Sequence, residues 1–215
     1  MKPLEINNAV GIVSADEGFS NCVITPGGVV LAPRHTFEKD PDKFSRKIKF
    51  EGVCIIGDER VGIIFEGKNR HQDLVVGRHP DLRDLVNGIP IATSLNYDNL
   101  NIYGHQIRRL GKSRFKTIPI HTNVLNFWLS DFKNDKRFRH HTEEEIIMVV
   151  GKEAVKKLKE GTSGAAVIQT HLYINLPFIR DYFRSDKLVG IHTSNTKNGT
   201  VYAAYVPRYL SIDIE

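Results

Sequence analysis

A serine lies between glycines in the stretch EGTSGAAV, residues 160–167, which leads into an apolar run typical of a β-strand. Two other stretches are built in a similar way. In GVVLAPRHTF, residues 28–37, an apolar strand delivers a histidine, and in QDLVVGR, residues 72–78, an aspartate directly precedes an apolar strand. Each of these reactive side chains lies at a strand edge or in a glycine turn. The three stretches therefore predict a β fold whose strand ends carry the functional residues.

Most of the remaining chain also reads as short strands separated by turns. β-Branched and aliphatic residues suit a pleated surface, and Gly27 with Gly28 predicts a hairpin turn. Helical composition is confined to residues 152–160. Thr142 with Glu145 fits a helix capping box, but the residues that follow resemble a strand, so the sequence does not decide between helix and strand for that segment. Many short strands with little helix predict an all-β barrel or sandwich. The predicted strands are 9–13, 21–25, 29–32, 47–56, 61–66, 73–78, 91–94, 106–110, 117–121, 146–150, 165–169, 187–193 and 200–206.

Composition restricts the class of protein. Of the 215 residues 40% are hydrophobic and 26% charged, which predicts a soluble globular chain. No apolar run approaches the roughly 20 residues that span a bilayer, and the first residues lack the pattern of a signal peptide. Cys22 and Cys54 each lie in an apolar string without a C-x-x-C partner, so we expect two buried reduced thiols and no zinc site.

The formal net charge of +5 permits contact with an acidic partner. A basic stretch offers a possible RNA contact, although such runs are usually solvated faces. Its cationic residues are Arg108, Arg109, Lys112, Arg114 and Lys116.

The three reactive residues suit one kind of chemistry. A serine hydroxyl such as that of Ser163 needs an adjacent base to become a nucleophile, and a histidine such as His35 titrates near neutrality and can take that proton. A carboxylate orients the histidine and stabilises its charged form, and Asp73 is the candidate, with Asp58 and Glu59 as other acids in the same half. The flanking glycines let the amides of Gly161 and Ser163 converge on a developing oxyanion. Together these residues predict a serine nucleophile with a complete triad.

These stretches and a fourth, VGIHTSN at residues 189–195, resemble the chymotrypsin-like endopeptidases. The resemblance is closest to the polyprotein-processing proteases of picornaviruses and potyviruses. In that branch the motifs are an apolar strand before His, Asp before apolar residues, Gly-x-Cys/Ser-Gly, and Gly-Ile-His. They follow one another here in the same order over nearly the whole chain.

The resemblance implies two antiparallel β-barrels and a serine endopeptidase that processes a viral polyprotein in the host cytoplasm, without a cofactor or metal. Residues 1–85 would form the barrel with His35 and Asp73, 86–98 a linker, and 99–215 the barrel with Ser163. The family's pocket histidine is matched by His192, which would donate a hydrogen bond to Gln or Glu before the cut. The backbone of Thr193, Ser194 and Asn195 would pair with the polypeptide substrate.

The sequence departs from the family pattern at several positions. The nucleophile is serine where the picornavirus and potyvirus enzymes use cysteine. Leu158 stands where the family usually has a pocket threonine, Ala165 and Ala166 replace the common Gly/Ser-Pro pair, and the stretch from Ser163 to His192 is longer than usual. None of these changes removes a catalytic group.

Two other functions stay open at this point. A bacterial-type glutamyl endopeptidase also combines a serine nucleophile with a pocket histidine. An RNA-binding module on a protease-like fold would use the basic stretch instead. A metal site at His140 and His141 is not expected, because adjacent residues point in different directions on a strand or a helix.

Overall fold

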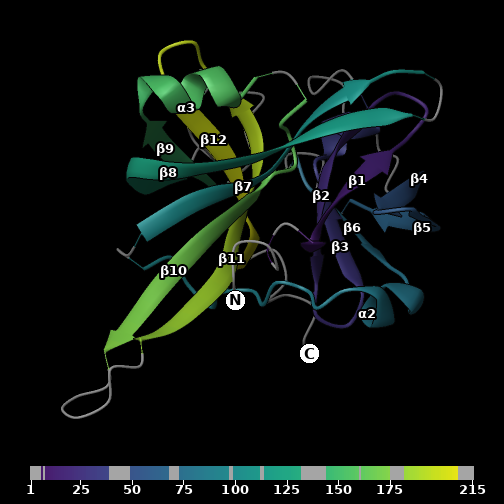
Figure 1. Cartoon of the computed structure of the whole chain (residues 1–215), viewed down its shortest axis with the longest axis horizontal. Coiled ribbons are helices and arrows are strands. Elements are labelled where there is room, and N and C mark those ends of the chain that lie inside the picture. The colour runs from purple at the N-terminus through teal and green to yellow at the C-terminus, as the bar shows by residue number, and fades with distance from the viewer. Residues whose placement is uncertain are drawn as a thin grey trace.

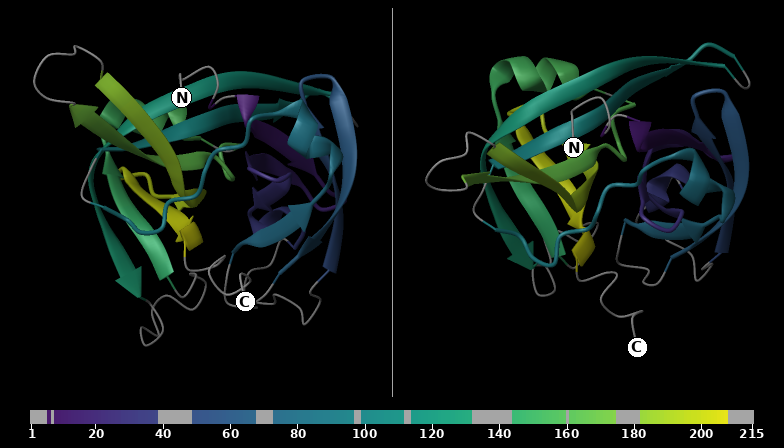
Figure 2. Two further views of the ribbon diagram at one scale, coloured as in Figure 1. Left: turned by 90° about the horizontal axis from the view of Figure 1, so that it is seen from below. Right: turned by 60° about the horizontal axis from the view of Figure 1, so that its bottom comes forward.

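The computed structural model describes residues 6, 8–38, 49–67, 73–96, 99–111, 114–131, 144–159, 161–174 and 182–207. Figures 1 and 2 show two β-barrels packed beside each other. Both barrels are closed and their paired strands run antiparallel, so the prediction of an all-β, two-barrel fold is confirmed. Barrel 1 consists of β1 Val10–Ser14, β2 Phe19–Thr25, β3 Val29–Ala32, β4 Lys49–Ile56, β5 Glu59–Glu66 and β6 Val75–Arg78. Barrel 2 consists of β7 Asn99–Arg109, β8 Phe115–Asp131, β9 Glu144–Val150, β10 Ala166–Ile174, β11 Tyr182–Asn195 and β12 Thr200–Tyr205.

Barrel 1 closes because β1 pairs with both β2 and β4. The alternation of a half-buried strand is clear in β5, where Ile63 and Phe65 point into the core and Ile64 is 60% exposed. The same core holds Cys22 and Cys54 as free, buried thiols, as predicted, with their Sγ atoms 3.5 Å apart. The hydrogen bond with Cys54, together with burial, raises the pKa of Cys22.

Barrel 2 closes through the pairing of β10 with β7. Its strand β8 is much longer than the predicted 117–121, because it pairs with β7 along its first half and with β9 along its second. Pro119 lies in the first half, where β7 is the one described neighbour, and proline is typical of such edge segments. The open segment around Glu145 is strand β9, and its candidate cap Thr142 lies outside the described residues, as do His140 and His141.

The connection between β6 and β7 contains the short helix α2 Asp81–Leu85 and then an extended segment. The predicted strand at 91–94 is wrong: Ile91 forms an isolated bridge with Leu188, and the segment pairs no further. Pro90 interrupts the segment because it has no N–H to donate. The segment is nevertheless fastened to both barrels, since the Ile89 amide donates to the Ile24 carbonyl and the Ala92 amide to that of Leu188.

The short helix α3 Lys152–Lys157 falls within the predicted helical stretch and precedes the serine loop. Within the described residues, no helix has the length and apolarity needed to cross a membrane. A buried apolar cluster joins the two barrels, with Val23 and Leu31 from barrel 1 and Tyr103, Ile168 and Leu188 from barrel 2. This cluster fixes the strand ends of the two barrels against each other.

Candidate active site

His35 and Asp73 lie at the same end of one pair of strands. His35 lies in η1 Arg34–Thr36, directly after β3, and Asp73 lies just before β6. Because β3 and β6 are antiparallel neighbours, with Ala32 opposite Val75, the end of one strand meets the start of the other. Two hydrogen bonds join the residues: His35 Nδ1 lies 2.6 Å from Asp73 Oδ2, and the His35 amide donates to Asp73 Oδ1 at 2.8 Å.

Asp73 sets the charge state of this histidine. Burial lowers the pKa of His35, but the negative charge of Asp73 and its hydrogen bond outweigh burial, so that the pKa rises above its ordinary value of 6.5. Because the carboxylate accepts from Nδ1, the neutral ring presents Nε2 as a proton acceptor. The side chain is 31% exposed. A base of this kind is accessible and oriented before substrate arrives.

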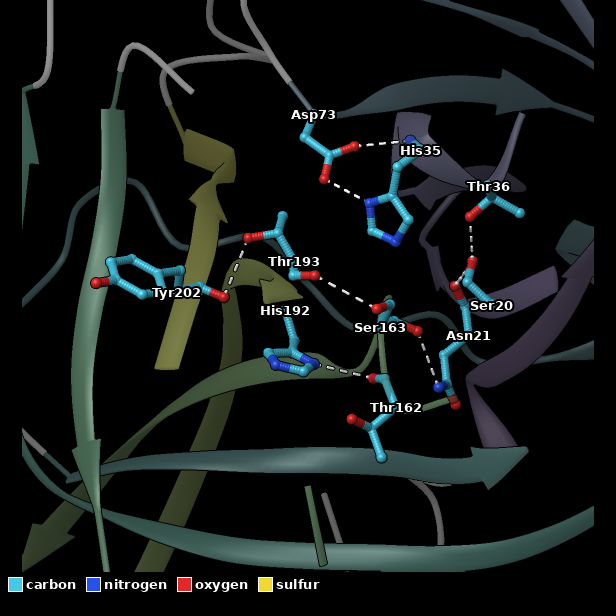
Figure 3. Close-up of polar contacts among 10 residues, drawn as sticks. All are labelled: Ser20, Asn21, His35, Thr36, Asp73, Thr162, Ser163, His192, Thr193 and Tyr202. Atoms are coloured by element: carbon cyan, nitrogen blue, oxygen red, sulfur yellow. Dashed lines mark hydrogen bonds and ion pairs between the residues drawn. The ribbon is translucent and has the colours of Figure 1, made fainter. Parts of the chain in front are cut away.

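Ser163 lies on the loop between α3 and β10, and Figure 3 shows the His35 ring between Asp73 and this serine. Its hydroxyl donates to the Thr193 carbonyl oxygen at 3.3 Å. The hydroxyl must therefore rotate before it can donate to His35. Catalytic hydrogen bonds often form fully only when substrate is bound. The structure thus brings the three predicted triad residues to one place at the junction of the barrels.

The serine loop is held in a conformation that glycine alone adopts readily. Gly161 and Gly164 have φ angles of +86° and +83°. The Gly161 carbonyl accepts from the Ile107 amide at 3.1 Å, and a Cβ on Gly161 would lie 2.3 Å from the Ile107 carbonyl oxygen. No described residue accepts a hydrogen bond from the amides of Gly161 or Ser163. These two donors, which the sequence assigned to an oxyanion hole, are therefore unused within the described chain.

His192 holds one of these donors in place. Its Nδ1 donates to the Thr162 carbonyl oxygen at 3.0 Å, and the Ala165 amide donates to the same oxygen. That carbonyl belongs to the peptide group that contains the Ser163 N–H, and in a trans peptide the two point in opposite directions. By fixing the carbonyl, His192 also fixes the direction of the Ser163 N–H.

The environment of His192 favours its neutral form. The side chain is 1% exposed, and Nε2 has no partner among the described residues. Burial is the largest influence and lowers the pKa of His192 below 6.5; the backbone of Thr162 and of Ser194 partly opposes it, and the charge of His35 adds to it. A carbonyl can only accept, so Nδ1 carries the proton and neutral His192 has an acceptor at Nε2.

The segment from Thr193 to Asn195 lies at the end of β11. Ser194 pairs with Tyr202 of β12, and a register shift between His192 and Ser194 places a bulge at Thr193. The pairing of β10 with β11 ends at Ile191, so no described strand covers the other edge of this segment. That edge adjoins Ser163, whose hydroxyl donates to the Thr193 carbonyl oxygen, and Ser194 and Asn195 are exposed.

The remaining predicted residues lie in barrel 2. Leu158 is 1% exposed and its side chain packs in the core of that barrel, so it offers no exposed surface to a substrate in this structure. Its carbonyl accepts from the Asn195 side chain at 2.8 Å. Of the basic stretch, Arg108 lies directly opposite Lys116 on exposed strands, and Lys112 lies outside the described residues.

Sequence analysis missed a group of buried polar residues in barrel 1. Asn21 is fully buried and its side chain donates to the Ser163 carbonyl oxygen at 3.0 Å. Thr36 donates to the Ser20 hydroxyl, which in turn donates to the Asn21 carbonyl oxygen. The sequence offered one signal for this group: Ser20 and Asn21 are two polar residues at the start of an apolar strand. Polar groups that are buried in such a strand need hydrogen-bond partners.

No protein-family model matches the sequence, and no curated protein does. Solved structures do match over nearly the whole chain. The Rv3671c protease from M. tuberculosis H37Rv, in an inactive form, has a TM-score of 0.58 and 10% identity, covering 98% of this chain and 91% of its own. A human pathogenic astrovirus serine protease has a TM-score of 0.51 and 11% identity, covering 95% and 91%.

A catalytically inactive tobacco etch virus protease in complex with substrate has a TM-score of 0.53 and 11% identity, covering 99% of this chain and 86% of its own. These neighbours are proteases of the chymotrypsin fold, including viral ones. At such low identity the likeness establishes the fold alone, because one fold can carry many functions.

Proposed function

We propose that this chain is a serine endopeptidase that processes a viral polyprotein in the host cytoplasm by cutting after Gln or Glu. The observation that carries the proposal is the His35–Asp73 pair beside a serine whose loop offers two unused amide donors. The viral role and the choice of Gln or Glu draw on the resemblance of the four sequence motifs, and the viral proteases among the structural neighbours are consistent with them.

The proposed reaction begins when the Ser163 hydroxyl turns from Thr193 to His35. Ser163 Oγ bonds to the carbonyl carbon of the substrate while its proton moves to His35 Nε2, and the carbonyl oxygen becomes an oxyanion. The amides of Gly161 and Ser163 stabilise that charge. His35 then gives the proton to the leaving amine as the C–N bond breaks. Water, activated by His35, hydrolyses the acyl-enzyme, and the proton returns to Ser163.

The substrate would bind along the open edge of Thr193–Asn195 as an added strand. The resemblance gives His192 the role of a donor to Gln or Glu, but the hydrogen bond to Thr162 leaves neutral His192 with an acceptor at Nε2. An acceptor pairs with the side-chain N–H of Gln, whereas a Glu carboxylate needs a protonated ring. Because Nε2 is covered, a substrate side chain reaches it only when the surrounding segment shifts.

This assignment predicts a pH-dependent choice between Gln and Glu. The lowered pKa of His192 keeps the ring neutral at neutral pH, so Gln is preferred there. As the pH falls through the pKa, the protonated ring donates to Glu and the ratio of Gln to Glu cleavage decreases. Two peptides that differ only in this residue, cleaved in one mixture, give the ratio without interference from the titration of His35. A ratio that is constant with pH contradicts the assignment.

The class of activity is tested independently of specificity. A fluorophosphonate probe should label Ser163, and a peptide library read by mass spectrometry should show cuts after Gln or Glu. Ser163→Ala should lose both, whereas Ser94→Ala, on an exposed hydroxyl outside the site, should retain both. A folded protein that is not labelled and cuts no peptide contradicts the proposal. Cuts after other residues would support the triad and contradict the role of His192 in specificity.

The same library also tests the glutamyl endopeptidase alternative, since cleavage restricted to Glu at neutral pH would favour it.

RNA binding is a second candidate function, favoured by one observation. Arg108 and Lys116 face each other across β7 and β8, and like charges placed this way repel each other unless an anion lies between them. Salt-sensitive RNA binding that survives Ser163→Ala would support it.

A further inference from the structure

Asn21 lies where barrel 1 meets barrel 2. It belongs to β2, its side chain is fully buried, and it reaches both β7 and the serine loop. Asn21 Oδ1 accepts from the His105 amide at 2.8 Å, and Nδ2 donates to the His105 carbonyl at 2.9 Å and to the Ser163 carbonyl at 3.0 Å. The side-chain amide therefore connects a strand of each barrel to the serine loop, and Figure 3 shows its contact with Ser163.

The three side-chain contacts require an amide. One oxygen must accept and one nitrogen must donate twice, which is the hydrogen-bonding capacity of Asn. An ionised Asp accepts only, so its second oxygen would face the carbonyl oxygens of His105 and Ser163. Ser or Thr has a single donor. Apolar residues would remove the side-chain partner of the buried His105 amide and carbonyl, and would leave the Ser163 carbonyl with the Asn21 backbone amide alone.

The backbone of Asn21 holds the same loop. Its amide donates to the Ser163 carbonyl at 2.8 Å, so that carbonyl accepts two hydrogen bonds from one residue. A Cβ on Gly164 would lie 1.8 Å from the Asn21 carbonyl oxygen, which shows how closely the loop approaches β2. Ser163 is thus fixed on its C-terminal side by barrel 1.

A chain of buried hydroxyls continues from Asn21 to the base. Thr36, next to His35, donates to Ser20 Oγ at 2.7 Å, and Ser20 Oγ donates to the Asn21 carbonyl at 2.9 Å. Thr36 and Ser20 are 2% and 1% exposed. The turn that carries His35 and the loop that carries Ser163 are therefore linked through one continuous polar chain, separate from the direct approach of their side chains.

We propose that Asn21 is a positioning residue, which sets the distance and direction of Ser163 relative to His35 through this chain. The inference rests on the proposed serine endopeptidase function and adds a residue outside its triad and pocket. Asn21 does not touch the reacting atoms. Its effect is on orientation, and a displacement of about 1 Å at a catalytic group can cost about 100-fold in rate.

The test compares Asn21→Asp with Thr25→Val. Thr25 lies on the same strand, is 2% exposed and donates one side-chain hydrogen bond to Val29, so its loss is a matched buried change away from the loop. We expect Asn21→Asp to lower kcat per active site by about 100-fold with KM changed by less than about 3-fold. Thr25→Val should leave kcat per active site unchanged. Active sites are counted with the fluorophosphonate probe.

A change of pH adds a second reading. A protonated carboxyl regains one donor, so the activity of Asn21→Asp relative to the parent should rise as the pH falls. A milder variant, Ser20→Ala, breaks the hydroxyl chain and should lower kcat about 5-fold, which keeps the proposal testable where Asn21→Asp does not fold.

The two possible failures are distinguishable. If the parent protein is neither labelled nor active, the proposed function fails. If the parent is labelled and cleaves peptide, while folded Asn21→Asp and Ser20→Ala keep the parent kcat per active site, the positioning role is overturned. A fall in the number of active sites alone, with normal kcat for those that remain, would assign Asn21 to folding and likewise overturn it.

Discussion

The base and the nucleophile of the candidate site are held in place by different means. His35 and Asp73 belong to one barrel and are joined directly through two hydrogen bonds. Ser163 is positioned by the backbone of its loop, which is tied to Asn21 in barrel 1, to Ile107 on β7 and to His192 on β11. The base depends on one barrel, and the nucleophile depends on the packing of both.

Because of this difference, the positions of His35 and Ser163 should respond differently to substitutions. The position of His35 follows from the pairing of β3 with β6, so a change in barrel 2 should leave it intact. The position of Ser163 should respond to changes on either side of the barrel junction. Substitutions at His35 or Asp73 should therefore leave the position of Ser163 intact, and those around the serine loop should change the position of Ser163 as well as stability.

The largest effect is expected from Asp73→Asn. Loss of the carboxylate disturbs the tautomer of His35 and removes the charge that stabilises its protonated form, so kcat should fall by about 10⁴-fold. The pKa of His35 should also fall, because Asp73 raises it. Since the neutral ring is the active base, the acid limb of the kcat/KM profile should move to lower pH.

The control is Asp81→Asn, which alters an exposed aspartate 3.7 Å from His79 in the same half of the chain. It should leave both kcat and the acid limb unchanged. An acid limb that stays in place in Asp73→Asn would mean that a different group controls it, and would remove the charge of Asp73 from the account of the base.

His35 and Asp73 could be predicted from the sequence because the signals for both residues are local. The histidine follows an apolar strand and the aspartate precedes one, and the pairing of those strands brings the two residues together. The glycines beside Ser163 likewise marked a loop with positive φ. The two-barrel fold followed from the resemblance of the four motifs.

Features that depend on contacts between distant segments could not be predicted in this way. Asn21 reads as an ordinary residue at the start of a strand, and its side-chain partners His105 and Ser163 lie 84 and 142 positions away. The side chain of Leu158 lies in a core that forms when α3 packs on barrel 2. Strand β8 appeared short because much of it is exposed and lacks a clear apolar alternation.

A smaller effect, on stability, is expected from Gly164→Ala. Both Gly164 and Gly27 have a φ of +83°, but a Cβ at Gly27 meets no atom within 4 Å, whereas one at Gly164 meets the Asn21 carbonyl oxygen. Gly27→Ala should lower the free energy of unfolding by about 1–2 kcal/mol from backbone strain. Gly164→Ala should lower it by at least about 2 kcal/mol more, because the loop or β2 must shift. Urea unfolding measures both, and equal losses would contradict the close packing of the loop on Asn21.

The smallest effect compares one cross-strand pair from each barrel. In barrel 1, Lys49 lies opposite Glu66 with their charged atoms 3.4 Å apart, and in barrel 2, Arg108 lies opposite Lys116. Lys116→Glu should therefore raise the free energy of unfolding by about 0.2–1 kcal/mol, and Lys49→Glu should lower it by a similar amount. Both changes should shrink in high salt, because the pairs are exposed. If Lys116→Glu brings no gain in stability, the two cations do not repel each other as placed. If Lys116→Glu raises the stability and also weakens RNA binding, Arg108 and Lys116 repel each other in the free protein and bind an anion together. The β7–β8 pair would then have a role separate from the triad.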